Sequence, residues 1–334
     1  MDRSPISVLT AQPQTSPTPI EFNDYSTRKE EMSTAISKTV SYLAGGDTTP
    51  DWRYSNLLKQ YAATQGNLHQ LSWRNALLVT LQYPAATHIK SKDSWTRSGA
   101  VAQSDEHRIW IWEPIYDTAC PRCGNTPAYH DKLHVDCEYH ERGSPEHWRT
   151  DVVGTRPAPY FDVAQVAGGT LEADDIQSPL EGIGGKALKE ICCEMASEDG
   201  YKLNTVDRRD LQDSLGQLRR SAMTLQPIID IAAVGLPSEA LSAVKYHLLA
   251  DYAASGDSYG YTDEDETIAA WAAFAVGSCI GYDESHFSPK ATFPVPLGGT
   301  PQSVEESLQA ISETTDSYVK RLQQHAQRRK RNIL

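Results

Sequence analysis

The sequence predicts an α+β fold, with a small α+β domain at the N-terminus and a mainly helical domain at the C-terminus. Three observations lead to this prediction. Apolar residues recur at helical spacing before residue 82, a short β-branched and aromatic run follows at 107–112, and helical spacing returns after about residue 182. The chain of 334 residues, 39% of them hydrophobic, is long enough for two domains with ordinary cores.

The N-terminal domain is expected over residues 25–172, after a disordered arm at 1–24 that is rich in Ser, Thr, Pro and Gln. The predicted strand at 107–112 ends at Pro114, and a second extended run follows at 160–163. Apolar residues at spacings of three and four predict three helices. The first starts at about Ser26, the second covers 51–63, and the third runs from Ser72 to Leu81 and stops before Pro84.

The C-terminal domain is expected over residues 182–324, and a basic tail with Arg328 to Arg331 follows at 325–334. An acidic stretch at 172–175 predicts a linker between the two domains. The predicted helices of this domain cover 188–195, 241–252, 268–280 and 304–322.

The formal net charge is −13, from 44 acidic and 31 basic residues. Taken alone, this charge disfavours DNA binding that depends on neutralising phosphates. A DNA-binding role requires either basic residues concentrated on one face, or an acidic proteome in a salt-rich cell, where base stacking contributes more of the affinity. No stretch has the roughly 20 apolar residues that cross a bilayer, and the N-terminus shows no secretion signal, so we expect a cytoplasmic protein.

The densest group of metal-ligating residues is CPRCGNTPAYHDKLHVDC, within a polar loop expected at 116–150. Two thiolates at C-x2-C spacing can reach one tetrahedral zinc ion, and two further ligands across a short loop complete its coordination. Four protein ligands leave no open position, so the predicted cofactor is structural zinc. The predicted ligands are Cys120, Cys123, His130 and Cys137, with His134 and His140 as rival ligands. A metal-free loop with a chance C-x2-C is the alternative.

Tryptophans alternate with basic residues between positions 73 and 112. Aromatic side chains beside cations suit single-stranded DNA, because every base offers a face for stacking. Trp73, Trp110 and Trp112 are expected inside the core of a small domain. The candidate DNA contacts are therefore Arg74, Asn75, Trp95 and Arg108. The alternative is that all of these tryptophans are core residues.

One predicted helix of the C-terminal domain carries the run His247-Leu248-Leu249-Ala250-Asp251. Zinc peptidases use H-E-x-x-H, in which two histidines one helical turn apart bind the metal and the glutamate acts as general base. Here Leu248 replaces the glutamate and Asp251 replaces the second histidine. Because leucine transfers no proton, a structural role for His247 is favoured over catalysis.

The N-terminal motifs resemble the ArdC-like single-stranded-DNA-binding (antirestriction) domain, in the version common in salt-adapted archaea. The resemblance covers about 120 residues in five ordered stretches, at 71–89, Trp95, 108–115, 120–140 and 157–171. It implies that single-stranded DNA is the partner, and that the four predicted zinc ligands are the recurring positions of an inserted zinc-binding loop. One departure lies at 103–107, where the family commonly shows a Gly/Lys/Glu turn, so a phosphate contact by that lysine is lost.

Members of this family usually continue into a zinc metallopeptidase domain of the ImmA/IrrE type. Residues 241–255 fall where their H-E-x-x-H helix lies, and 265–285 resemble the second helix, which supplies a glutamate ligand. Glu266 matches that ligand only after a shift of two residues. The resemblance therefore implies a zincin-like domain whose catalytic residues are largely replaced.

We therefore expect a single-stranded-DNA-binding, antirestriction-like protein with a structural zinc ion. Its peptidase-like domain is expected to be inactive and to serve structure or interaction, so no catalytic residue is assigned. One alternative is an active zinc metallopeptidase that uses His247, Asp251 and Glu266. The other is a purely structural interaction protein.

Overall fold

The computed structural model describes residues 20–22, 26–45, 52–103, 107–119, 149–168, 180, 183–211, 215–220, 227–233, 236–255, 261–282, 286 and 299–333. Residues 1–19 of the arm expected at 1–24, the acidic stretch at 172–175 and all four predicted zinc ligands lie outside these residues. Within the expected arm, Ile20 and Phe22 are buried in a hydrophobic core rather than disordered. Within the described residues, helices combine with small sheets, which confirms the mixed α+β class.

The N-terminal half begins with the predicted helices and continues into short antiparallel sheets. Ser72 caps the third helix, because its hydroxyl accepts a hydrogen bond from the backbone N–H of Asn75. The predicted helices are α2 (Arg28–Ala44), α3 (Trp52–Asn67) and α4 (Trp73–Gln82), and the short α5 (Lys92–Arg97) was not predicted. One sheet has the order β1 (Ile89–Ser91), β4 (Arg149–Asp162) and β3 (Ile109–Ala119), and a second pairs β2 (Val101–Ala102) with β5 (Val166–Ala167).

Strand β3 is longer than predicted, because it continues through Pro114 and stays paired with β4 as far as Ala119. The N–H groups of Trp110 and Trp112 point toward α4 rather than toward β4. Pro114 lies two residues after Trp112, so its backbone nitrogen points to the same side of the strand. No strand pairs on that side, and the N–H that proline lacks is therefore not needed there. The predicted strand end at Pro114 is therefore wrong, and the ends of the expected loop at 116–150 belong to strands.

The C-terminal half combines long helices with a small mixed sheet. The helices, all at predicted positions, are α8 (Gly185–Glu198), α9 (Leu236–Ser255), α10 (Asp263–Cys279) and α11 (Pro301–Ile333). The sheet, which was not predicted, has the order β6 (Lys202–Val206), β8 (Pro227–Ala232) and β7 (Gly216–Arg220). The predicted basic tail is the last part of α11.

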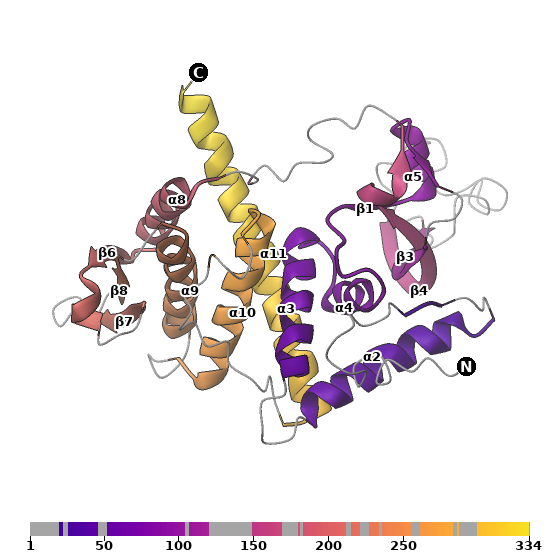
Figure 1. Cartoon of the computed structure of the whole chain (residues 1–334), viewed down its shortest axis with the longest axis horizontal. Helices are drawn as coiled ribbons and strands as arrows, with labels where there is room; N and C mark the ends of the chain where they lie inside the picture. Colours follow the sequence, from indigo (N-terminus) through magenta and orange to yellow (C-terminus); the bar gives the residue numbers. More distant parts are fainter. Residues whose placement is uncertain are drawn as a thin grey trace, which may run out of the picture.

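Two large hydrophobic cores organise the described residues, and one of them joins the two predicted domains. In that core, Leu58 of α3 and Leu77 of α4 pack in one cluster with Trp271 of α10 and Leu308 of α11. Figure 1 shows α3 beside α10, and α11 running from the side of α2 to the side of α8. The second core lies between α8, α9, α10, α11 and the sheet β6–β8–β7. Among the described helices, none has both the length and the apolar character that crossing a bilayer requires.

The contact between α3 and α10 depends on Gly66. A Cβ atom at this position would lie 1.9 Å from the carbonyl oxygen of Ala275. Glycine therefore allows the two helix backbones to approach each other more closely than any other residue would. Since α3 and α10 come from different predicted domains, this contact ties the two halves of the chain together.

Candidate functional site

A groove of about 910 Å³ lies between α4, the edge of β3, α2 and α11. Residues 72–75 and 111–114 both contribute to its lining. Trp112 and Tyr160 are both half-buried in its lining. The fold thus places the motif Ser72-Trp73-Arg74-Asn75 near two half-buried aromatic residues, whose side chains leave opposite faces of the β3–β4 pair.

Two amide side chains of α4 hold the free edge of β3 beside this groove. The Asn75 Nδ2 donates to the Trp112 carbonyl oxygen at 2.9 Å, and the Trp112 N–H donates to the Asn75 Oδ1 at 2.8 Å. Gln82 forms the same two bonds with the backbone of Trp110, both at 2.8 Å. These amides satisfy backbone groups that have no partner strand. In contrast to the expectation that Asn75 contacts DNA, its amide is used inside the protein and positions Trp112.

Arg74 lies at the border of the groove, and its side chain is 57% exposed. Its guanidinium lies 4.9 Å from the ring centroid of Trp73, which is buried as expected, and 3.2 Å from the carboxylate of Glu305. An exposed ion pair of this kind contributes at most about 1 kcal/mol. Arg74 can therefore exchange Glu305 for a phosphate at little cost.

Trp95 and Arg108, the other two candidate DNA contacts, do not line this groove. Trp95 is fully buried, and its Nε1–H donates to the carbonyl oxygen of Phe161 at 2.9 Å. It is a core residue, in contrast to the expectation that it stacks on a base. Arg108 is exposed just before β3 begins.

The structure adds Trp112, Tyr160 and Lys29 to the candidate site. Trp112 was expected in the core, and it does pack against one of the two large cores, but the residue is only half-buried. Tyr160 belonged to the predicted extended run at 160–163 without a role in binding. Lys29 carried no local signal, because its place in the groove depends on how α2 packs against α4.

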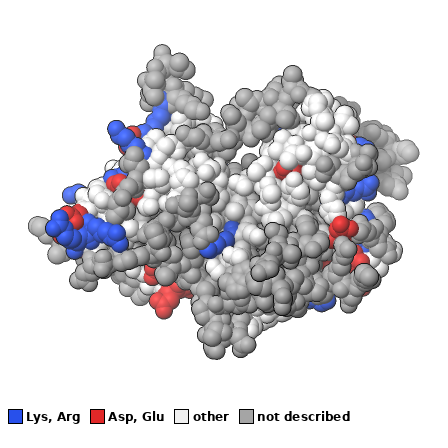
Figure 2. Space-filling model, viewed as in Figure 1, with Lys and Arg blue, Asp and Glu red and all other residues white. Residues whose placement is uncertain are grey.

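The charge of the groove is mixed. Lys29 and Arg74 share the lining with Glu113, Glu305 and Glu313. On the face drawn in Figure 2, Lys and Arg side chains gather at the left end, where Figure 1 places the sheet β6–β8–β7. Few phosphates can be neutralised inside the groove itself, so any nucleic acid bound there must gain most of its affinity from stacking.

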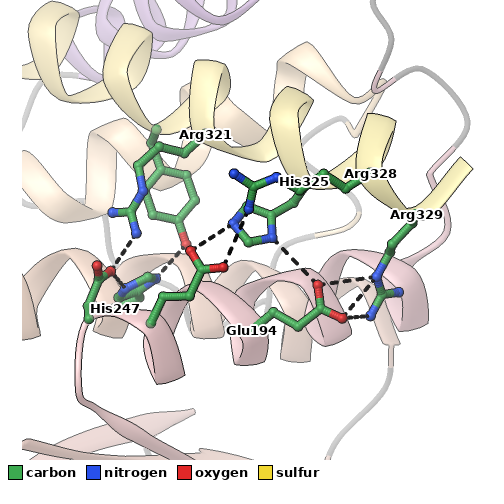
Figure 3. A network of polar contacts seen from close by, with 9 residues as sticks. Glu194, His247, Arg321, His325, Arg328 and Arg329 are labelled. Carbon is green, nitrogen blue, oxygen red and sulfur yellow. Dashed lines mark hydrogen bonds and ion pairs between the residues drawn. The ribbon is translucent and has the colours of Figure 1, made fainter. Parts of the chain in front are cut away.

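A second cluster of functional side chains surrounds His247 of α9, which is fully buried. The His247 Nε2 lies 2.9 Å from Oδ2 of Asp199, at the C-terminal end of α8, and its Nδ1 lies 3.0 Å from the Tyr318 hydroxyl of α11. The Arg321 guanidinium donates to the same Asp199 oxygen at 2.6 Å (Figure 3). Asp251 stands one turn after His247, and the ligand-type atoms of Asp199, His247 and Asp251 lie within 4.8 Å of one another.

Burial and charge set the protonation of this cluster. Burial lowers the pKa of His247, against the opposing effect of Asp251 and Asp199, so the ring is neutral at neutral pH. Burial alone would raise the pKa of Asp199, but hydrogen bonds from Arg321 and His247 bring it below its ordinary value. Since a carboxylate only accepts, the neutral ring donates from Nε2 to Asp199 and accepts at Nδ1 from the hydroxyl of Tyr318. Both ring nitrogens are therefore used within the protein.

These residues do not fit the alternative of an active zinc centre formed by His247, Asp251 and Glu266. Leu248, at the position of the general base, is buried and apolar. Glu266, the expected third ligand, pairs with Lys245 at 2.7 Å and is not part of the group around His247. Asp199 takes the third position instead. No local sequence signal marks Asp199, because only the packing of α8 against α9 brings it to His247.

No family model matches the sequence, and no curated protein matches it. Among solved structures, the crystal structure of the antirestriction protein ArdC from the R388 plasmid, in a metal-free form, is similar to this chain, with 9% sequence identity and a TM-score of 0.41. The similarity covers 81% of this chain and 98% of that chain. A similarity of this size carries no conclusion about function.

Proposed function

We propose that the groove between α4 and β3 binds single-stranded DNA. The observation that carries the proposal is the placement of Trp112 and Tyr160, both half-buried, beside Arg74 in a groove of about 910 Å³. Aromatic faces accept any unpaired base, and cations at their border accept the phosphates between bases. The sequence motifs that resemble a single-stranded-DNA-binding domain support the same ligand, and an antirestriction role is proposed as its biological use.

The charge of the groove favours a single strand over a duplex. A duplex hides its base faces and is held mainly through many phosphate contacts. Among the lining residues, Lys29 and Arg74 are opposed by three glutamates. A single strand can instead place its bases on the exposed parts of Trp112 and Tyr160, with few phosphate contacts.

Fluorescence anisotropy of a labelled oligonucleotide with the full chain tests this proposal. We expect tighter binding of the single strand than of the duplex of the same sequence. Arg74→Ala is expected to weaken binding and to reduce the slope of log K against log salt by about 0.7. The matched control is Arg209→Ala, which also removes an arginine from an exposed ion pair, with Asp207 at 3.1 Å, but beside the sheet β6–β8–β7. The control is expected to bind as the wild type does.

Two results would contradict the proposal. One is duplex binding that equals or exceeds single-strand binding. The other is an equal loss in Arg74→Ala and Arg209→Ala, which would place the DNA elsewhere. A variant with glutamine at positions 328, 330 and 331 removes three positive charges and keeps α11. If this variant no longer binds DNA, the binding is due to the C-terminal cations and not to the groove.

We also propose that the chain has no peptidase activity. A general base typically contributes a rate factor of about 10²–10⁴, and Leu248 supplies none. Incubation of the full chain with unstructured peptides and zinc is expected to give no cleavage that a chelator inhibits. Cleavage that is lost in His247→Ala would overturn this proposal. The structural zinc ion at Cys120, Cys123, His130 and Cys137 stays a proposal from the sequence.

A further inference from the structure

Basic side chains of α11 neutralise carboxylates of α8 along the line where the two helices meet (Figure 3). Arg321 pairs with Asp199 at 2.6 Å, and Arg329 pairs with Glu194 at 2.6 Å. Arg321 differs from Arg329 in one respect. The carboxylate that it binds belongs to a group of three metal-ligating side chains, whose ligand-type atoms lie within 4.8 Å of one another.

The three side chains Asp199, His247 and Asp251 are of types that bind divalent cations such as Zn²⁺ and Co²⁺. A separation of up to 4.8 Å needs only small side-chain movements to place all three around one ion. In the structure, however, Oδ2 of Asp199 is bound by both Arg321 and His247. A metal ion would have to displace the guanidinium from this oxygen, and the ring proton of His247 would have to move from Nε2 to Nδ1.

The cluster can be reached from solvent. A pocket of about 310 Å³ is lined by Asp251, Tyr252, Tyr318 and Arg321, so it opens directly beside the cluster. The Arg321 side chain, which lines this pocket, is 31% exposed. An ion that enters the pocket would therefore approach the carboxylates next to a fixed positive charge, which repels it.

We propose that the Arg321 guanidinium is the resident cation of the Asp199–His247–Asp251 cluster and excludes divalent metal ions from it. The guanidinium supplies the positive charge that the two carboxylates require, and its hydrogen bond orients Asp199 toward the ring of His247. Loss of the charge at position 321 then exposes a three-ligand site for a divalent cation. This inference is independent of DNA binding in the groove.

Binding of Co²⁺ to the full chain, freed of metal by chelation, tests the inference. Equilibrium dialysis and visible absorption are compared between the wild type, Arg321→Met and the double variant Arg321→Met/His247→Gln. Arg321→Met is expected to bind one more Co²⁺ per chain than the wild type, and the double variant is expected to lose that ion. Arg329→Met is the matched control. It also removes an arginine of α11 that pairs with a carboxylate, but that carboxylate, Glu194, does not belong to the Asp199–His247–Asp251 cluster. It is expected to bind as much Co²⁺ as the wild type.

Comparison with His247→Gln in the wild-type background keeps the test decisive if Arg321→Met does not fold. The inference predicts the same metal content for the wild type and His247→Gln, since the predicted cysteine site contributes equally to both. A lower metal content in His247→Gln would show that a metal ion already binds the native cluster, and it would overturn the inference. A folded Arg321→Met chain that gains no Co²⁺ would overturn it as well.

Discussion

The outer edge of β3 faces a helix, so the backbone of this strand depends on the amides of Asn75 and Gln82. Each amide both donates to and accepts from one residue of the strand. Trp112 is held at the groove by this arrangement. A side chain can thus support binding without touching the ligand, by fixing the backbone of the residue that does.

Asn75→Ala is expected to destabilise the protein, because it leaves the N–H and the carbonyl of Trp112 without partners. An unsatisfied buried polar group costs about 1–3 kcal/mol. Urea unfolding measures the loss, with Gln309→Ala as control, since Gln309 lines the same groove and its amide donates to the exposed carboxylate of Glu313. Equal stability of the two variants would show that the amide of Asn75 does not support the strand.

The contacts of Asp230 in the sheet β6–β8–β7 can be tested by measuring the stability of the protein at acidic pH. Its carboxylate is 3% exposed and accepts hydrogen bonds from Asn204, Gln217 and Arg219. Burial alone would raise the pKa of Asp230, but these hydrogen bonds hold it below the ordinary value. Since the pKa is lower in the folded state, the stabilisation is present above the unfolded pKa of about 3.9 and is lost as the pH falls through the folded pKa.

Asp230→Asn is therefore expected to be less stable than the wild type at neutral pH. The difference is expected to shrink as the pH falls below about 4, because the wild type then loses the contribution of the carboxylate. Urea unfolding at a series of acidic pH values measures both curves. Parallel curves would mean that this carboxylate has the same pKa in both states.

Local sequence patterns predicted the helices well because a helix is defined by residues three and four positions apart. Ser72 and Pro84 bounded α4 correctly, and apolar spacing located α8 to α11. The sheet β6–β8–β7 was missed because its strands have only five or six residues and pair across loops. Trp112 and Asp199 were missed as site residues for a related reason, since their roles depend on contacts between distant segments.

At the level of elements, Gly66→Ala tests the contact of α3 with α10. Alanine favours an isolated helix by about 1 kcal/mol, but its Cβ atom would meet the Ala275 backbone. Overpacking of this kind costs about 1–3 kcal/mol, so we expect a lower melting temperature. Gly184→Ala is the control, because a Cβ there meets no atom within 4 Å. A Gly66→Ala chain as stable as the wild type would show that the two helices do not meet closely.

The shared core joins segments from both expected domains. The sequence divided the chain into domains at 25–172 and 182–324, whereas the packed structure places Trp271 and Leu308 in the same core as Leu58 and Leu77. We expect a fragment of residues 1–172 to lack cooperative unfolding, because removal of α10 and α11 exposes this core to water. A fragment with a sharp urea transition would instead support two independent domains.

In the proposed complex, single-stranded DNA stacks on aromatic side chains of the groove between α4 and β3. Titration of a labelled single strand with Trp112→Phe and Trp112→Ala chains, both checked for an intact fold by circular dichroism, tests this claim most directly. Loss of a stacking ring typically costs about 1–3 kcal/mol of binding free energy. We predict a loss of this size in Trp112→Ala and near wild-type affinity in Trp112→Phe, which keeps an aromatic face. A folded Trp112→Ala chain that binds the single strand as tightly as the wild type would contradict the claim.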